Sequence, residues 1–144
     1  MTGDSEACSE GAANGFAHLR GAATGDVAAM RSLVALGMTQ AAEGPDIITL
    51  VETLVFARMA AVVGDLNDTA TLLSVLGVTI MLLEGQEQWS EYRDQLQGEG
   101  IAITSQLADA GVEIADQFLP CMVDDAGPQA AAIAKDFAVR MAAI

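Results

Sequence analysis

Cationic side chains are scarce in this chain of 144 residues. Lysine and arginine together number 6, against 20 acidic residues, so the net charge is −14 near neutral pH. A protein that binds nucleic acid needs basic side chains to neutralise phosphates, and we therefore exclude nucleic acid as a partner. The negative field favours attraction to basic proteins. The plain alternative is that the acidic surface only opposes aggregation.

The residues that usually form metal and catalytic centres are equally few. The chain has one histidine, His18, and two cysteines, Cys8 and Cys121, which lie far apart in the sequence. No Cys/His spacing typical of a metal site is present, so we expect no metal, no cofactor and no disulfide framework. Catalysis needs an acid, a base or a nucleophile within reach of another such group. None is evident, and we predict that the protein is not an enzyme.

One acidic cluster, Asp65-Leu66-Asn67-Asp68, resembles the start of a calcium-binding loop. The pattern then fails, because Ala70 stands where a glycine is needed and Leu76 stands where a bidentate glutamate belongs. We interpret the cluster as a helix N-terminus that is rich in capping residues.

No apolar run has the length of a membrane-spanning helix. The longest uncharged one covers residues 69–83, which is fewer than the roughly 18 to 20 residues required. Residues 1–6 are acidic and lack the basic and apolar regions of a signal peptide. Because 52% of the residues are apolar, disorder is excluded as well. We predict a single domain over residues 1–144 that is cytoplasmic and does not contact a membrane.

The apolar residues recur at helical spacing along the whole chain. Alanine is abundant and strand-type alternation is nearly absent, which favours helices. Glycine and acidic residues separate the segments, and Gly98-Glu99-Gly100 is one of the predicted breaks. We predict an all-α fold of about seven helices, arranged as three stacked helical hairpins with a C-terminal capping helix. The helices are expected at about residues 8–23, 27–43, 47–63, 66–83, 86–97, 101–119 and 128–144.

The helix expected over residues 47–63 is apolar almost all round. One face carries Ile47, Leu50, Leu54, Ala57 and Ala61. Much of the remainder is covered by Ile48, Val51, Val55, Met59 and Val62. Such a helix is normally buried on most sides, so we predict a central element. Together with residues 66–83 it has more apolar surface than a small monomer can bury, and we therefore predict a homodimer.

An internal repeat underlies these segments. A glycine–acid turn followed by an apolar helix occurs at Gly25-Asp26, Gly64-Asp65 and Gly98-Glu99, at spacings of 39 and then 34 residues. Periods of this size are typical of stacked helical hairpins. Within the following helices, Gly37, Gly77 and Gly111 fall at the same depth. They mark either a close helix–helix approach, which we favour because the apolar pattern continues past them, or the end of each helix.

These turns and the apolar helices with small residues are similar to the hairpins of α-solenoid proteins, loosely the tetratricopeptide and Sel1-like group. A second resemblance is to ankyrin repeats, carried by residues 22–37 and echoed by residues 107–111. Either resemblance implies a protein-binding scaffold without chemistry of its own.

Trp89, Tyr92 and Arg93 are the candidate partner-binding residues. They are the only tryptophan, the only tyrosine and one of six basic residues, and they lie within about a turn and a half of one predicted helix. Aromatic residues and arginine are the preferred anchors of protein interfaces. The alternative is that Trp89 and Tyr92 form the core face of an otherwise polar helix.

The sequence therefore predicts a non-enzymatic interaction module, or a small acidic chaperone or adaptor, that binds a helix or peptide of a partner protein. The charge favours a basic partner. The alternative function is an acidic inhibitor or nucleic-acid mimic, which would use the net charge of −14 to occupy a basic site of its target.

Overall fold

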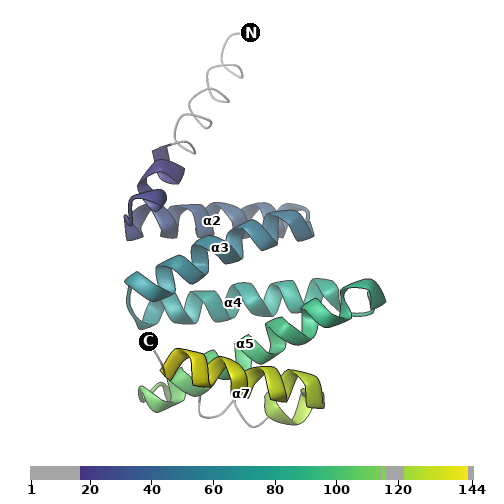
Figure 1. Ribbon diagram of the computed structural model, residues 1–144. Helices are drawn as coiled ribbons and strands as arrows, with labels where there is room; N and C mark the ends of the chain where they lie inside the picture. The colour runs from purple at the N-terminus through teal and green to yellow at the C-terminus, as the bar shows by residue number, and fades with distance from the viewer. Residues whose placement is uncertain (1–16, 114, 116–121, 143–144) are drawn as a thin grey trace. The chain divides into compact units, whose positions relative to one another are not determined.

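A computed structural model of the chain describes residues 17–113, 115 and 122–142 (Figure 1). Over these residues every regular element is helical, and the protein has the predicted all-α fold of about seven helices. Cys8 and Cys121 lie outside the described residues, as do parts of the predicted helices at 8–23 and 101–119. The chain divides into two compact units, Met1–Asp68 and Thr69–Ile144. The single domain over residues 1–144 stays a prediction.

The first unit contains a hairpin of two helices, α2 (Val27–Glu43) and α3 (Ile47–Val63), which pack against each other. An aspartate caps the N-terminus of each, Asp26 in α2 and Asp46 in α3. The carboxylate of Asp26 accepts a hydrogen bond at 3.0 Å, and that of Asp46 accepts one at 3.3 Å, in each case from the backbone N–H two residues further on. These caps satisfy backbone donors that the helix itself leaves unpaired. Gly44 ends α2.

The two helices of this hairpin approach each other closely at Gly37. A Cβ atom placed there would lie 3.0 Å from the Cβ of Thr53 on α3 and would overlap its hydroxyl group. Thr53 is buried and donates its hydroxyl to the carbonyl of Thr49 at 2.7 Å. The close-approach interpretation is therefore confirmed for Gly37.

The second unit contains α4 (Leu66–Leu83) from Thr69 onward, the short 3-10 helix η1 (Glu87–Trp89), α5 (Ser90–Asp109) and α7 (Pro128–Ala142). Within this unit α5 packs against α7. Pro128 is the first residue of α7. The backbone nitrogen at this position makes no hydrogen bond within a helix, so a proline here costs none.

Helix α5 runs without interruption through Gly98-Glu99-Gly100, where the sequence predicted a break. The prediction was wrong because these residues are buried and packed. A Cβ atom at Gly98 would lie 2.6 Å from Cγ2 of Ile133 and 2.9 Å from the carbonyl oxygen of Ala130, both on α7. Contact with α7 offsets the cost of about 1 kcal/mol that a glycine imposes on a helix interior. The spacing of 34 residues therefore does not mark a turn.

Gly77 and Gly111 do not repeat the role of Gly37. Gly77 lies inside α4, which continues to Leu83, and no neighbouring atom lies within 4 Å of the position of its Cβ. Gly111 follows the last turn of α5 and has a φ of +88°, as a glycine that ends a helix does. The close-approach interpretation is wrong for both, and the helix-ending interpretation is correct for Gly111.

Helix α3 is less buried than a central element should be. Its face around Leu50 and Leu54 is fully buried, but the opposite face is exposed. The exposed fractions are 65% for Ile48, 47% for Val55 and 83% for Val62. We refer to this face as the α3 stripe, which consists of Ile48, Val51, Val55, Met59 and Val62.

Among the described residues, α4 is the one helix that is long and apolar enough to cross a bilayer, and 39% of it is buried. The uncharged run in the sequence begins at Thr69 and is too short to span a bilayer, whereas the folded helix begins at Leu66 and has 18 residues. A single helix of this kind is also common in the cores of soluble proteins, so it does not by itself indicate a membrane protein.

Candidate functional site

Trp89, Tyr92 and Arg93 lie together where η1 leads into α5. Trp89 is the last residue of η1, and the other two lie in the first turn of α5. The aromatic rings meet edge to face, with centroids 6.3 Å apart and an interplanar angle of 62°, an arrangement that aromatic pairs favour. Trp89 is 37% exposed, whereas Tyr92 and Arg93 are half-buried. Trp89 is therefore not part of a buried core face, and its role as a partner anchor stays a prediction.

The side chain of Arg93 is not fully satisfied. Its Nε atom is buried and has no hydrogen-bond partner. A buried N–H without an acceptor is unfavourable because its interaction with water is lost without replacement.

A groove lies between α5 and α7, and its first lining residue, Glu91, follows Trp89 by two positions in the sequence. It has a volume of about 440 Å³. We call it the α5–α7 groove; it is lined by Glu91, Asp94 and Gln95 of α5 and by Gln129, Ala132 and Ile133 of α7. Because Gly98 lies on the same face of α5 one turn beyond Asp94, the contact of Gly98 with Ile133 brings the two helices together at that end.

The α5–α7 groove combines acidic and apolar side chains. Glu91 and Asp94 supply two carboxylates from α5, while Ala132 and Ile133 supply apolar surface from α7. Among the residues that the structure describes, no basic side chain lines the groove. This combination suits a partner segment that carries ammonium or guanidinium groups beside aliphatic side chains, because charge then meets opposite charge.

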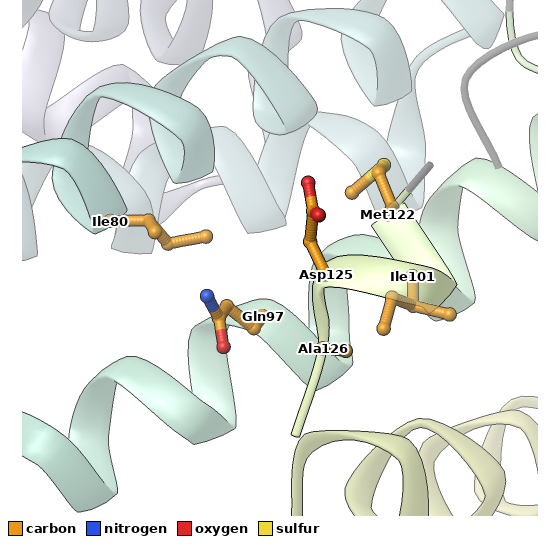
Figure 2. A pocket seen from close by; sticks show the side chains of 6 residues that line it. All are labelled: Ile80, Gln97, Ile101, Met122, Asp125 and Ala126. Carbon is orange, nitrogen blue, oxygen red and sulfur yellow. The ribbon is translucent and has the colours of Figure 1, made fainter. Parts of the chain in front are cut away.

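A second pocket of the same unit is lined by Ile80, Gln97, Ile101, Met122, Asp125 and Ala126. Figure 2 shows the amide of Gln97 and the carboxylate of Asp125 directed toward the space between Ile80 and Met122. Its volume of about 180 Å³ is small, since pockets for small molecules measure roughly 300 to 1,000 Å³. The pocket therefore offers little room for a substrate.

The first unit has a pocket of similar size, about 200 Å³, between α2 and α3. The apolar side chains of Leu33, Leu36 and Phe56 line it, and Gln40 and Glu52 add polar groups. Its volume suits one inserted side chain better than a complete ligand.

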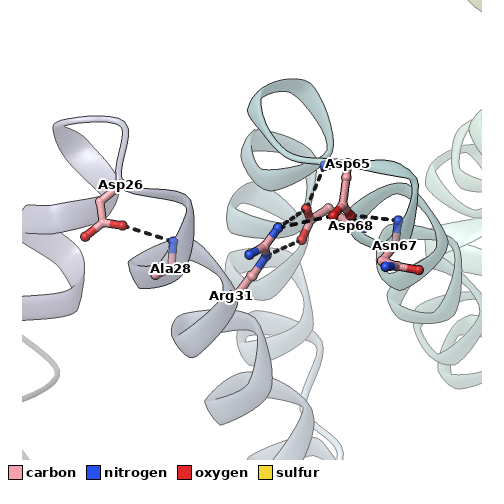
Figure 3. A network of polar contacts seen from close by, with 6 residues as sticks. All are labelled: Asp26, Ala28, Arg31, Asp65, Asn67 and Asp68. Atoms are coloured by element: carbon pink, nitrogen blue, oxygen red, sulfur yellow. Dashed lines mark hydrogen bonds and ion pairs between the residues drawn. The ribbon is translucent and has the colours of Figure 1, made fainter.

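The cluster that resembles a calcium loop is a helix cap reinforced by an ion pair (Figure 3). Oδ1 of Asp65 accepts hydrogen bonds from the backbone N–H groups of Asn67 at 2.9 Å and Asp68 at 3.3 Å. In return, Oδ2 of Asp68 accepts from the N–H of Asp65 at 2.9 Å. Arg31 of α2 donates Nε and Nη2 to the two oxygens of Asp68, both at 2.7 Å. This reciprocal pattern is a capping box, as the sequence indicated.

The ion pair shifts the titration of both partners. The hydrogen bonds from Arg31 are the main cause that lowers the pKa of Asp68 to about 2, against the opposing effect of burial. The same contact raises the pKa of Arg31. A carboxylate with a shifted pKa can mark a functional site. Here, however, the guanidinium of Arg31 already pairs with the carboxylate of Asp68. We conclude that the network holds the start of α4 to α2.

Within the described ranges, no group of three or more histidine, cysteine, aspartate or glutamate side chains is placed to hold a metal ion. His18 is half-buried on the helical segment that precedes α2. Metal-dependent chemistry thus has no candidate site in the part of the chain that the structure describes.

Sequence reasoning found the aromatic cluster but missed the α5–α7 groove. The cluster is local, since its three residues lie within a short stretch of the chain. The groove depends on α7, and the false break at Gly98-Glu99-Gly100 divided the helix that forms one of its walls. The signal that could have found it was the glycine itself, because a glycine in an otherwise helical pattern often admits a neighbouring helix.

The chain matches no model of a known protein family, no curated protein and no solved structure in the comparisons made. The tetratricopeptide, Sel1-like and ankyrin resemblances therefore stay predictions.

Proposed function

We propose that the protein is a non-enzymatic interaction module that binds a helix or peptide of a basic partner protein in the α5–α7 groove, with Trp89 and Tyr92 as anchors beside it. The observation that carries this proposal is the groove, which combines two carboxylates of α5 with apolar side chains of α7. An adaptor or a small acidic chaperone of the cytoplasm would act in this way. No chemical step is assigned to the protein.

The proposed partner segment follows from the chemistry of the groove. Aliphatic side chains of a partner helix would contact Ala132 and Ile133, while its lysine or arginine side chains would meet Glu91 and Asp94. Helices commonly bind in grooves of this kind through one apolar face. The opposite charges would speed association, whereas the apolar contacts and an exposed aromatic anchor such as Trp89 would supply most of the affinity.

The net charge of −14 favours a second candidate function, that of an acidic inhibitor or nucleic-acid mimic. Such a protein would occupy a basic site of its target through its overall field rather than through a groove. The two functions differ in their response to salt. A mimic loses its target steeply as salt is added, because long-range attraction between exposed charges is screened.

The test uses a displayed library of helical and extended peptides, selected on the wild-type protein and measured against two double variants. Glu91→Gln with Asp94→Asn removes the charges of the groove, while Glu43→Gln with Glu84→Gln removes two exposed charges elsewhere. The groove variant should bind basic peptides with about tenfold lower affinity, as the loss of two contacts of about 0.5 to 1 kcal/mol each implies. The matched control should change affinity less than about twofold by the same arithmetic.

Trp89→Ala should lower the affinity for the same peptides. Binding of these peptides by the wild-type protein should persist at high salt. Equal weakening by the groove variant and the matched control, together with steep salt dependence, would contradict the groove and favour the mimic.

A further inference from the structure

The α3 stripe is an apolar surface that the proposed function leaves unused. Its outer members, Ile48 and Val62, are 65% and 83% exposed, and its centre, Val55, is 47% exposed. Val51 and Met59 lie between them and are half-buried, and Met59 also packs against the buried cluster around Met30. These five side chains occupy one narrow face of a helix of 17 residues. Exposed apolar surface of this kind can mark a site of association.

We propose that the α3 stripe is the contact surface of a two-fold homodimer, in which α3 of one protomer packs antiparallel against α3 of its partner. The intervals between successive members of the stripe are three, four, four and three residues. The stripe therefore has the same pattern in both directions from Val55. A two-fold interface requires this property, since residue i must meet residue j while j meets i.

The antiparallel arrangement places an apolar residue opposite every member of the stripe. Val55 meets Val55 of the partner subunit at the two-fold axis. Ile48 then lies level with Val62 of the partner subunit, and Val51 lies level with Met59 of the partner subunit. A small residue at the axis permits the close spacing of about 8 to 10 Å between helix axes that packed helices adopt. The opposed helix dipoles also favour this orientation.

The charge of α3 favours a second copy over a basic partner as the occupant. Helix α3 carries one acidic residue, Glu52, and one basic residue, Arg58, so its net charge is zero in a chain whose net charge is −14. A basic partner would be drawn to the acidic surfaces instead. Two copies of this chain repel each other, and that repulsion is weakest where they meet through a face without net charge.

The exposed area sets the expected strength. Three of the five side chains of the α3 stripe are exposed, so the stripe is smaller than the roughly 800 Å² that each partner contributes to a standard interface. Val63, which is 54% exposed, widens the surface at its C-terminal end. We therefore expect a dimer of micromolar affinity, which forms and dissociates with protein concentration.

The first experiment is sedimentation equilibrium of the full chain over about 1 to 200 μM, a range that brackets a micromolar dissociation constant. The wild type should shift from monomer to dimer. Val55→Glu places two carboxylates side by side at the axis and should remain monomeric throughout. The matched control is Val139→Glu, which replaces a valine on α7 that is 69% exposed and should dimerise as the wild type does. Circular dichroism melting verifies that both variants fold.

The second experiment tests the orientation by disulfide trapping in a background of Cys8→Ser and Cys121→Ser. Val55→Cys should form a covalent dimer on oxidation, because the two positions meet at the axis within reach of a disulfide. Val62→Cys should not, since its two copies lie roughly 21 Å apart, the length of 14 helical residues.

A strictly monomeric wild type would overturn the proposal. So would a dimer that survives Val55→Glu, or efficient trapping at Val62→Cys, which is the result that a parallel pair gives.

Discussion

The ion pair between Arg31 and Asp68 predicts a specific acid sensitivity. The pKa of Asp68 is lowered from 3.8 to about 2 in the folded protein. The folded state therefore favours the ionised form of Asp68 more strongly than the unfolded chain does. This contribution to stability is complete above the unfolded pKa and is lost as the pH falls from about 4 toward 2.

The magnitude follows from the shift. A difference of nearly two pKa units corresponds to a little over 2 kcal/mol, at 1.36 kcal/mol per unit. Although the side chain of Asp68 is only 6% exposed, that of Arg31 is 49% exposed. Water and salt screen the pair from the side of the arginine, so we reduce the expected contribution to about 1 to 2 kcal/mol.

The perturbation is Asp68→Asn, which keeps the shape and one acceptor oxygen but removes the negative charge. Urea unfolding of the wild type and the variant is compared at a series of pH values between about 7 and about 1.5, which spans the titration. At neutral pH the variant should be less stable by about 1 to 2 kcal/mol. The difference should shrink toward zero at the acid end, because the wild-type carboxylate is then protonated as well.

The matched control is Asp136→Asn on α7. Asp136 pairs with Arg140 at 2.9 Å, but both side chains are largely exposed, at 62% and 76%. The loss should not exceed about 0.5 kcal/mol, as is usual for exposed pairs on one helix. A stability difference for Asp68→Asn that stays constant over the whole pH range would refute the reasoning, and so would an equal loss in the control.

Two glycine substitutions should change stability in opposite directions. Gly98→Ala should cost about 1 to 2 kcal/mol in urea unfolding, because the new methyl group collides with Ile133 and with a backbone carbonyl of α7. Gly77→Ala should instead stabilise the protein by about 0.5 to 1 kcal/mol, since alanine is the better helix former and no neighbour obstructs its Cβ. If both variants gained stability, Gly98 would not be a close-contact position.

The bounds of α2, α3 and α4 agree with the sequence prediction because their signals are local. An aspartate at the start of each helix caps it, and a glycine precedes it, at Gly25, Gly44 and Gly64. At these three positions the local signals agree with the folded structure. The aromatic cluster was likewise predictable, since Trp89 and Tyr92 are only three positions apart.

The remaining glycines show where local signals are insufficient. Gly37 and Gly98 accommodate a neighbouring helix, Gly111 ends one, and Gly77 does neither. The difference between them lies in what packs against each position. For Gly98 that neighbour is Ile133, 35 residues away along the chain. The α5–α7 groove could not be predicted for the same reason.

The two proposed surfaces differ in chemistry, and this difference makes them compatible. The α5–α7 groove attracts a basic segment through its carboxylates, so added salt weakens the attraction that brings the partner in. The α3 stripe carries no net charge, and its association is opposed by repulsion between two chains of net charge −14. Salt screens that repulsion and favours the dimer. A dimer carries two grooves, so a partner with two basic segments gains affinity from bivalent binding wherever its linker spans them.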